Sequence, residues 1–258
     1  MKSLIQLCLL FLVTFSQNIN ASTSITVKQS IAAQQSLTLQ YEQAPRLVQV
    51  IQDSLLSSEQ FTIKQQPKAI YWLSAGLYDS KTKIQFQQKK QQVLNSLKTQ
   101  YTDMGQPQNI NALKSLSSWI SSNKFIKREF IPLDFDSIRL KQELNPKLAS
   151  QYLLILPTKP DYVVVLGGVE KNGLQAFKAN QQAATYLDLA MPISDSENSF
   201  AWVIQPDGQI ENHPIAYWNQ HHIDIAPGAI IYLDFQGVRD NEPELNSAIL
   251  ELLRHWIR

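Results

Sequence analysis

Two carboxylates near the middle of the chain have a spacing that would let them act together. Asp134 and Asp136 are two residues apart, so an extended backbone would place both side chains on one face. Carboxylates about 5–9 Å apart can hydrolyse a glycosidic bond. Because Pro132 precedes the pair and Asp is common in turns, we favour a turn here and keep hydrolysis as the alternative.

Two arginines accompany these carboxylates. Arg139 follows Asp136 by three residues, and Arg128 lies where a predicted helical segment returns to strand structure. Arginines beside carboxylates are more often structural ion pairs than ligand clamps. A guanidinium can also form a forked pair with a carboxylate of a partner or an acidic sugar. Because Arg128 closes a polar hairpin, we predict that it contributes more to function than to folding.

Two aromatic pairs are candidates for contact with a sugar. Tyr71-Trp72 and Tyr217-Trp218 could stack on sugar faces, and we keep Trp218 as a candidate binding residue. Aromatic residues in strand-like runs are more often part of a core, and the large rings bury well. The core interpretation is therefore the one we favour for both pairs.

The histidines do not form a recognisable metal site. His221 and His222 are adjacent, so on a strand they would point to opposite faces, and their spacing to His213 fits no zinc template. The sequence also lacks a Gly-x-Ser-x-Gly elbow, a Walker loop and a dinucleotide fingerprint. We therefore expect no metal, no cofactor and no catalytic residues.

Composition limits the classes of protein that remain. The 258 residues are 44% hydrophobic and 17% charged, which suits a folded core. The 23 basic residues nearly balance the 22 acidic residues, and this balance argues against a nucleic-acid binder, which usually has a basic face.

The N-terminus predicts export. Residues 1–21 have a short basic start, an apolar run from Leu4 to Phe15 and a polar end at Ala21, which is typical of a signal peptide. A membrane span needs about 20 apolar residues, so we expect no transmembrane span in the mature protein. Cys8 lies inside the apolar run and not at a cleavage point, so we expect no lipid anchor and a mature chain without cysteine.

Hydrophobic periodicity predicts an α+β fold. The expected elements of the first half are strands within 24–39, a helix from Pro45, a strand at 68–73 and helices at about 81–101 and 110–120. Gly105 and Pro107 separate the two later helices, which is typical of a helical hairpin.

The second half repeats the order of strands and helix. The first half closes with strands at 129–133 and 152–156, and the expected strands of the second half are 162–168, 201–205 and 230–235, with a helix at 179–189. Pro157 and Pro160 indicate a domain boundary. The shared order suggests an internal duplication of a small α+β unit.

The last residues predict an amphipathic helix. Its apolar face consists of Leu245, Ile249, Leu252 and Trp256. Glu244 and Glu251 offset the basic residues of the last turn, so a membrane surface is the weakest of the possible covers. We expect the helix to dock on the protein's own domains, with a partner as the alternative. Removal of residues 243–258 should then lower stability.

Several short motifs resemble known families. Val163–Val169, Asn172-Gly173, Ala201–Gly208 and Pro227-Gly228 resemble a β-grasp module of the SLBB type, found in Wza-type polysaccharide exporters of the outer membrane. Arg128, Pro132–Arg139, Asn145–Leu148, Leu187, Pro214–Asn219 and His221-His222 resemble the GfcC capsule-biosynthesis family, and their order is more specific than any one motif.

The resemblance implies a fold. It consists of two β-grasp domains, at 22–158 and 159–238, with a helical hairpin inserted in the first at about 81–124 and a C-terminal amphipathic helix at 239–258. Arg128 matches the arginine that ends the family's hairpin. Lys127 replaces the family's glycine before it, and Asn172-Gly173 replaces a Pro-Gly turn, where Gly173 still permits positive φ.

The resemblance also implies a role. It predicts a non-enzymatic periplasmic accessory of capsule or extracellular polysaccharide biosynthesis and export, whose partners are the polysaccharide or outer-membrane export proteins. An envelope carbohydrate-active enzyme that uses Asp134 and Asp136 is the alternative, and a purely structural envelope protein is a third possibility.

Overall fold

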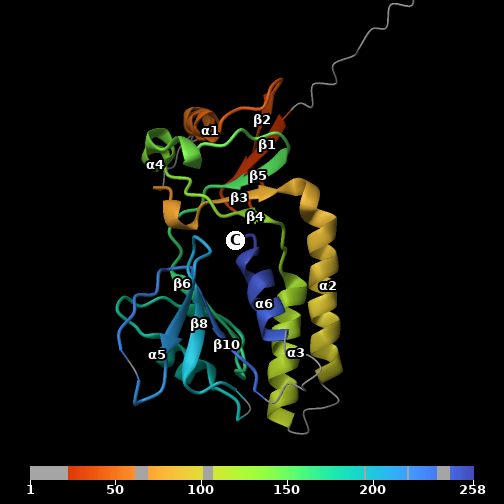
Figure 1. Cartoon of the computed structure of the whole chain (residues 1–258), viewed down its shortest axis with the longest axis vertical. Helices are drawn as coiled ribbons and strands as arrows, with labels where there is room; N and C mark the ends of the chain where they lie inside the picture. The colour runs from red at the N-terminus through yellow and green to blue at the C-terminus, as the bar shows by residue number, and fades with distance from the viewer. Residues whose placement is uncertain (1–22, 62–68, 101–106, 195, 220, 237–244) are drawn as a thin grey trace, which may run out of the picture.

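The computed structural model describes residues 23–61, 69–100, 107–194, 196–219, 221–236 and 245–258. The predicted signal peptide at 1–21 and Cys8 lie outside the described residues. The described chain is an α+β protein with two five-stranded sheets, and its helices pack against the sheets (Figure 1). No helix of the described residues is both long and apolar enough to span a membrane.

The first sheet has the strand order β2-β1-β5-β3-β4. Its strands are β1 (Thr23–Lys28), β2 (Leu37–Tyr41), β3 (Gly76–Asp79), β4 (Arg128–Glu129) and β5 (Gln151–Ile155). Strand β1 pairs antiparallel with β2 and parallel with β5, and β3 pairs antiparallel with β5 and β4. Alternation in β1 buries Ile25 and Val27, which form a core with α1 (Leu47–Phe61) and α4 (Phe135–Leu140).

The second sheet has the same topology, with the order β7-β6-β10-β8-β9. Its strands are β6 (Tyr162–Gly167), β7 (Gly173–Ala176), β8 (Phe200–Ile204), β9 (Ile210–Pro214) and β10 (Ile230–Leu233), with α5 (Ala183–Ala190) after the first hairpin. The hairpin strand β6 again pairs parallel with the last strand, β10, which pairs antiparallel with β8. The predicted repeat is therefore present at the level of strand order and direction.

Strands β6 and β10 of the second sheet are buried on both faces. Val163 and Val165 face α5, whereas Val164 and Leu166 pack with the helices on the opposite face. This double burial explains the continuous apolar run in β6, because a strand covered on both faces needs no polar alternation.

The helical hairpin crosses from the first sheet to the second. Helices α2 (Lys83–Gln100) and α3 (Pro107–Ser122) are inserted between β3 and β4 of the first sheet. Their apolar side chains join one core with the second sheet and α6 (Leu245–Arg254). Figure 1 shows the hairpin along one side of the molecule, with α6 between the hairpin and the second sheet.

Two sequence expectations for strands were wrong in detail. Within 69–73, residues from Trp72 enter a short 3₁₀ turn, and β3 begins at Gly76, where a break was predicted. Gly76 suits the strand because a Cβ there would lie 2.6 Å from the ring of Tyr78. The predicted strand at 129–133 shares only Glu129 with the observed strand β4.

Candidate binding site

Arg128 lies where the two halves of the chain meet. It begins β4, and its side chain is buried. Its Nη1 donates to the carbonyl oxygen of Pro206 at 2.6 Å, and its Nη2 donates to the carbonyl oxygen of Ala75 at 2.7 Å. The fork that we expected to receive a partner's carboxylate therefore holds one carbonyl from each half. These bonds satisfy a buried cation and support a structural contribution; a contact of Arg128 with a partner stays a prediction.

A second arginine reaches the same carbonyl. Arg258 Nη1 donates to the oxygen of Pro206 at 2.8 Å. Burial and, to a lesser extent, the nearby charge of Arg128 lower the pKa of Arg258 to about 10. The guanidinium remains protonated at neutral pH, so two cations meet at one carbonyl oxygen.

His255 holds the backbone of Arg128. Its Nδ1 accepts the N–H of Arg128 at 2.9 Å, which leaves the ring proton on Nε2, 3.1 Å from Glu251 Oε1. Burial lowers the pKa of His255, an effect that Glu251 partly opposes, so the folded protein favours the neutral ring. The sequence did not indicate this contact, because the residues are far apart in the chain.

The carboxylate pair has local structural partners. Asp134 is the N-cap of α4 and accepts the N–H of Ser137 at 3.2 Å, and its bonds with Ser137 lower its pKa. Asp136 is exposed and pairs with Arg139 at 3.4 Å. The favoured turn was wrong in detail, because a short helix begins here with Asp134 as its N-cap and Asp136 in its first turn. A lowered pKa suits a base but not the general acid that glycoside hydrolysis also needs.

The two aromatic pairs have different environments. Trp72 packs against the first core, as favoured. The core interpretation is wrong for the second pair: Tyr217 and Trp218 lie on a turn after β9, with 98% and 75% of their surfaces exposed. A strand-like run ended at Pro214, and the rings that follow it therefore lie beyond the sheet.

The histidines have acidic neighbours of their own. His213 is buried 2.9 Å from Glu211, and His222 lies 2.9 Å from Asp224. Within the described ranges, no three His, Cys, Asp or Glu side chains are grouped so that they could hold a metal ion.

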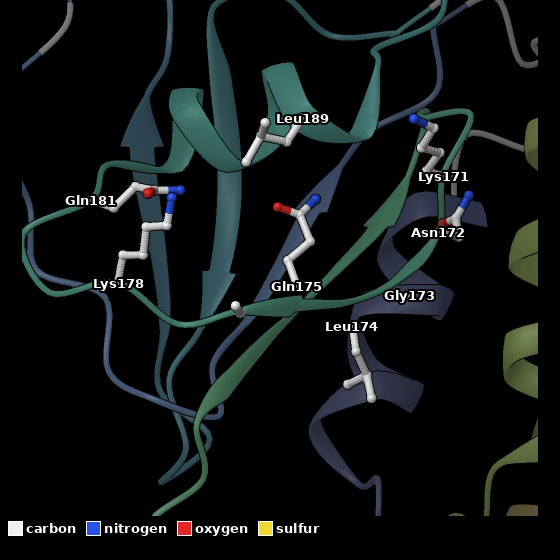
Figure 2. Close-up of a pocket in the computed structure, with 9 residues that line it drawn as sticks. Lys171, Asn172, Gly173, Leu174, Gln175, Lys178, Gln181 and Leu189 are labelled. Atoms are coloured by element: carbon white, nitrogen blue, oxygen red, sulfur yellow. The ribbon is translucent and has the colours of Figure 1, made fainter.

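A pocket of about 430 Å³ opens along the edge strand β7. It lies between β7 and α5, and Figure 2 shows its side chains. The lining residues are Lys171, Asn172, Gly173, Leu174, Gln175, Ala176, Lys178, Gln181 and Leu189. Sequence reasoning missed it, because lysines and glutamines near a turn are indistinguishable from ordinary polar surface.

The loop that begins the pocket is held by Asn172. Its Oδ1 accepts the N–H of Gly167 at 2.7 Å, and its Nδ2 donates to the carbonyl oxygen of Val169 at 2.9 Å. Gly173 follows with a φ of +147°, as its position in the motif predicted. The Asn172 amide therefore fixes the loop before β7. Because its donor and acceptor are both occupied, a ligand would bind through the other lining residues.

The fold and the site define a class of protein. It has two α+β units of one topology, and its candidate groups are aromatic rings, amides and lysines, which are binding groups. Residues 21–159 match the family described as "Capsule biosynthesis GfcC, N-terminal", and residues 171–258 match "Capsule biosynthesis GfcC C-terminal". The chain belongs to the GfcC capsule-biosynthesis family, as the sequence motifs indicated.

A relative is known from Escherichia coli strain K12. It is the uncharacterized protein YjbG, which is 34% identical over 148 residues. The matching stretch covers 57% of this chain and 60% of the relative.

Proposed function

We propose that the chain is a non-enzymatic periplasmic accessory of capsule or extracellular polysaccharide export, and that it binds glycan through the turn of Trp218. Family membership supports the polysaccharide context. The shared strand order and the helix after each hairpin support β-grasp units of the SLBB type. The predicted signal peptide supports the compartment.

The exposure of Trp218 is the observation that carries the proposed contact. Tyr217 and Trp218 are adjacent and both exposed, and contiguous apolar surface with a polar rim is typical of an interaction site. The indole face of Trp218 can stack on the C–H face of a sugar ring, and the phenol ring of the adjacent Tyr217 can do the same.

The turn that displays these rings is anchored. Asn219 Nδ2 donates to the carbonyl oxygen of Ser199 at 2.9 Å, and Ile215 packs against the second core. A turn fixed at both ends presents its rings with little loss of conformational entropy on binding.

Titration calorimetry tests this proposal with mature protein and the extracellular polysaccharide of the source strain. Trp218→Ala should weaken binding at least about tenfold, as expected when one aromatic anchor is lost. Leu140→Ala, which removes an equally exposed apolar group from the first half, is the control. Equal affinity of the wild type and Trp218→Ala would reject the turn. Binding of an export protein in place of the glycan would identify the alternative partner.

A further inference from the structure

We infer that the pocket at β7 binds a negatively charged sugar unit, an inference that rests on the proposed glycan-binding function. The pocket of about 430 Å³ has the size of a small-ligand site and is open to one side. It lies at the β7 edge of the second sheet, whereas the Trp218 turn follows β9 at the opposite edge.

Two buried amide atoms in the pocket lack partners among the described residues. Gln175 donates its Nε2 to the carbonyl oxygen of Tyr186 at 3.0 Å, which fixes the amide and leaves Oε1 as an acceptor. The Nε2 of Gln181 is a donor without a partner. Buried polar groups are normally paired, so such atoms indicate a place for a ligand's polar group.

A hydroxyl group is both a donor and an acceptor, the two functions that these amides lack. It can donate to the Oε1 of Gln175 and accept from the Nε2 of Gln181. Figure 2 shows the amide of Gln181 pointing toward Gln175 from the far end of the pocket. Sugars present rows of such hydroxyls, and the exposed side chain of Leu189 adds an apolar contact for the ring.

The charge of the pocket selects an anionic sugar. Lys178 points toward the same space as Gln181, and Lys171 lies at the other end (Figure 2). Within the described ranges neither ammonium group has a carboxylate at ion-pair distance, and no described lining residue is acidic. A carboxylate or phosphate on the sugar would pair with them.

A protein strand is the other possible occupant of this edge. Leu174 lies opposite Val164, which donates its N–H to the carbonyl oxygen of Ala229 on the β10 side. In an antiparallel pair this means that the N–H and C=O of Leu174 point away from the sheet. Lysines along an edge strand disfavour strand pairing, however, and Lys171 and Lys178 flank β7. The sugar is therefore the better-supported ligand.

Calorimetry and ¹⁵N spectra of the mature protein test the inference with three probes: tetragalacturonate, neutral maltotetraose and inorganic phosphate. Tetragalacturonate should bind more tightly than either other probe, and its affinity should fall with salt. Lys178→Ala and Gln181→Ala should each weaken it about tenfold or more. The Lys178 side chain is exposed and its backbone makes the bonds to Tyr186 Oη, so the variant should fold. Lys141→Ala, exposed in the first half, is the control.

Other outcomes would overturn the inference. Equal binding of maltotetraose would remove the role of charge, and equal binding of phosphate would remove the role of the sugar. Absence of binding at millimolar concentrations would reject the pocket as a sugar site. If Trp218→Ala abolishes polysaccharide binding while Lys178→Ala does not, this pocket is rejected and the proposed function stands.

Discussion

Arg128 illustrates what a residue's position in the sequence does and does not reveal. The end of the hairpin could be located from the helical period and the family motif. The groups that occupy its fork could not, because Ala75 and Pro206 are 53 and 78 residues away along the chain. The same limit applies to His255, which is 127 residues from Arg128. Local pattern identifies a residue, whereas only the fold supplies its distant partners.

The contact of His255 predicts a pH dependence of stability. Protonation of Nδ1 would remove the acceptor of the Arg128 N–H. Burial disfavours a charged ring, and so do the nearby cations Arg254 and Lys89, whereas Glu251 favours it. The folded-state pKa lies below 6.5, so the unfolded chain binds more protons between these two values. The free energy of unfolding should therefore fall as the pH is lowered through about 6.5, by at most about 1.4 kcal/mol per pH unit.

Urea denaturation between pH 5 and pH 8 measures this dependence. His255→Gln should be less stable at neutral pH and should lose this part of the pH slope. His221→Gln removes an exposed ring and should keep the slope of the wild type. A slope that His255→Gln leaves unchanged would contradict the assignment.

At the scale of elements, the C-terminal helix was predicted well because its signal is local. Leu245, Ile249 and Leu252 are buried on one face of α6, as amphipathic spacing requires. The placement of Trp256 on this helix was wrong, because α6 ends at Arg254 and the buried Trp256 forms a bridge with Phe125 beyond it. The surface that covers this face of α6 is less easily predicted. It is formed jointly by the hairpin and the second sheet, so the helix docks on the protein's own chain as favoured.

The residues after α6 tie this element to the first sheet as well. Trp256 Nε1 donates to Asn123 Oδ1 at 2.9 Å, and its carbonyl oxygen accepts the hydroxyl of Tyr78 at 3.1 Å. Removal of 243–258 would therefore remove several kinds of contact at once. A single core substitution measures the helix packing more cleanly.

Ile249→Ala should destabilise the protein by about 2–5 kcal/mol, because it removes a fully buried side chain and leaves a cavity. Thermal and urea denaturation give the difference. Ser247→Ala, an exposed change on the same helix, should alter stability by less than about 0.5 kcal/mol. A stable Ile249→Ala protein that no longer binds an export partner would favour a partner-facing helix.

At the scale of the molecule, the second half depends on the first for part of its core, whereas the first sheet also has a core of its own with α1 and α4. The hairpin is inserted in the first sheet, yet its apolar side covers the second sheet and α6. The repeat of strand order could be inferred from the alternation of strands and helix along the sequence. The packing of the hairpin on the second sheet could not be inferred from the sequence, because helical periodicity shows which face is apolar and not which surface covers that face.

This packing predicts that the two sheets unfold together. Leu116 of α3 is fully buried in the shared core, so Leu116→Ala should cost about 2–5 kcal/mol. Hydrogen exchange followed by mass spectrometry should show the same loss of protection in peptides from β1 and β5 as in peptides from β6 and β10. Gln88→Ala, an exposed change on α2, should leave both unchanged. Loss of protection in the second sheet alone would mean that the halves are independent units, joined by the hairpin without sharing its stability.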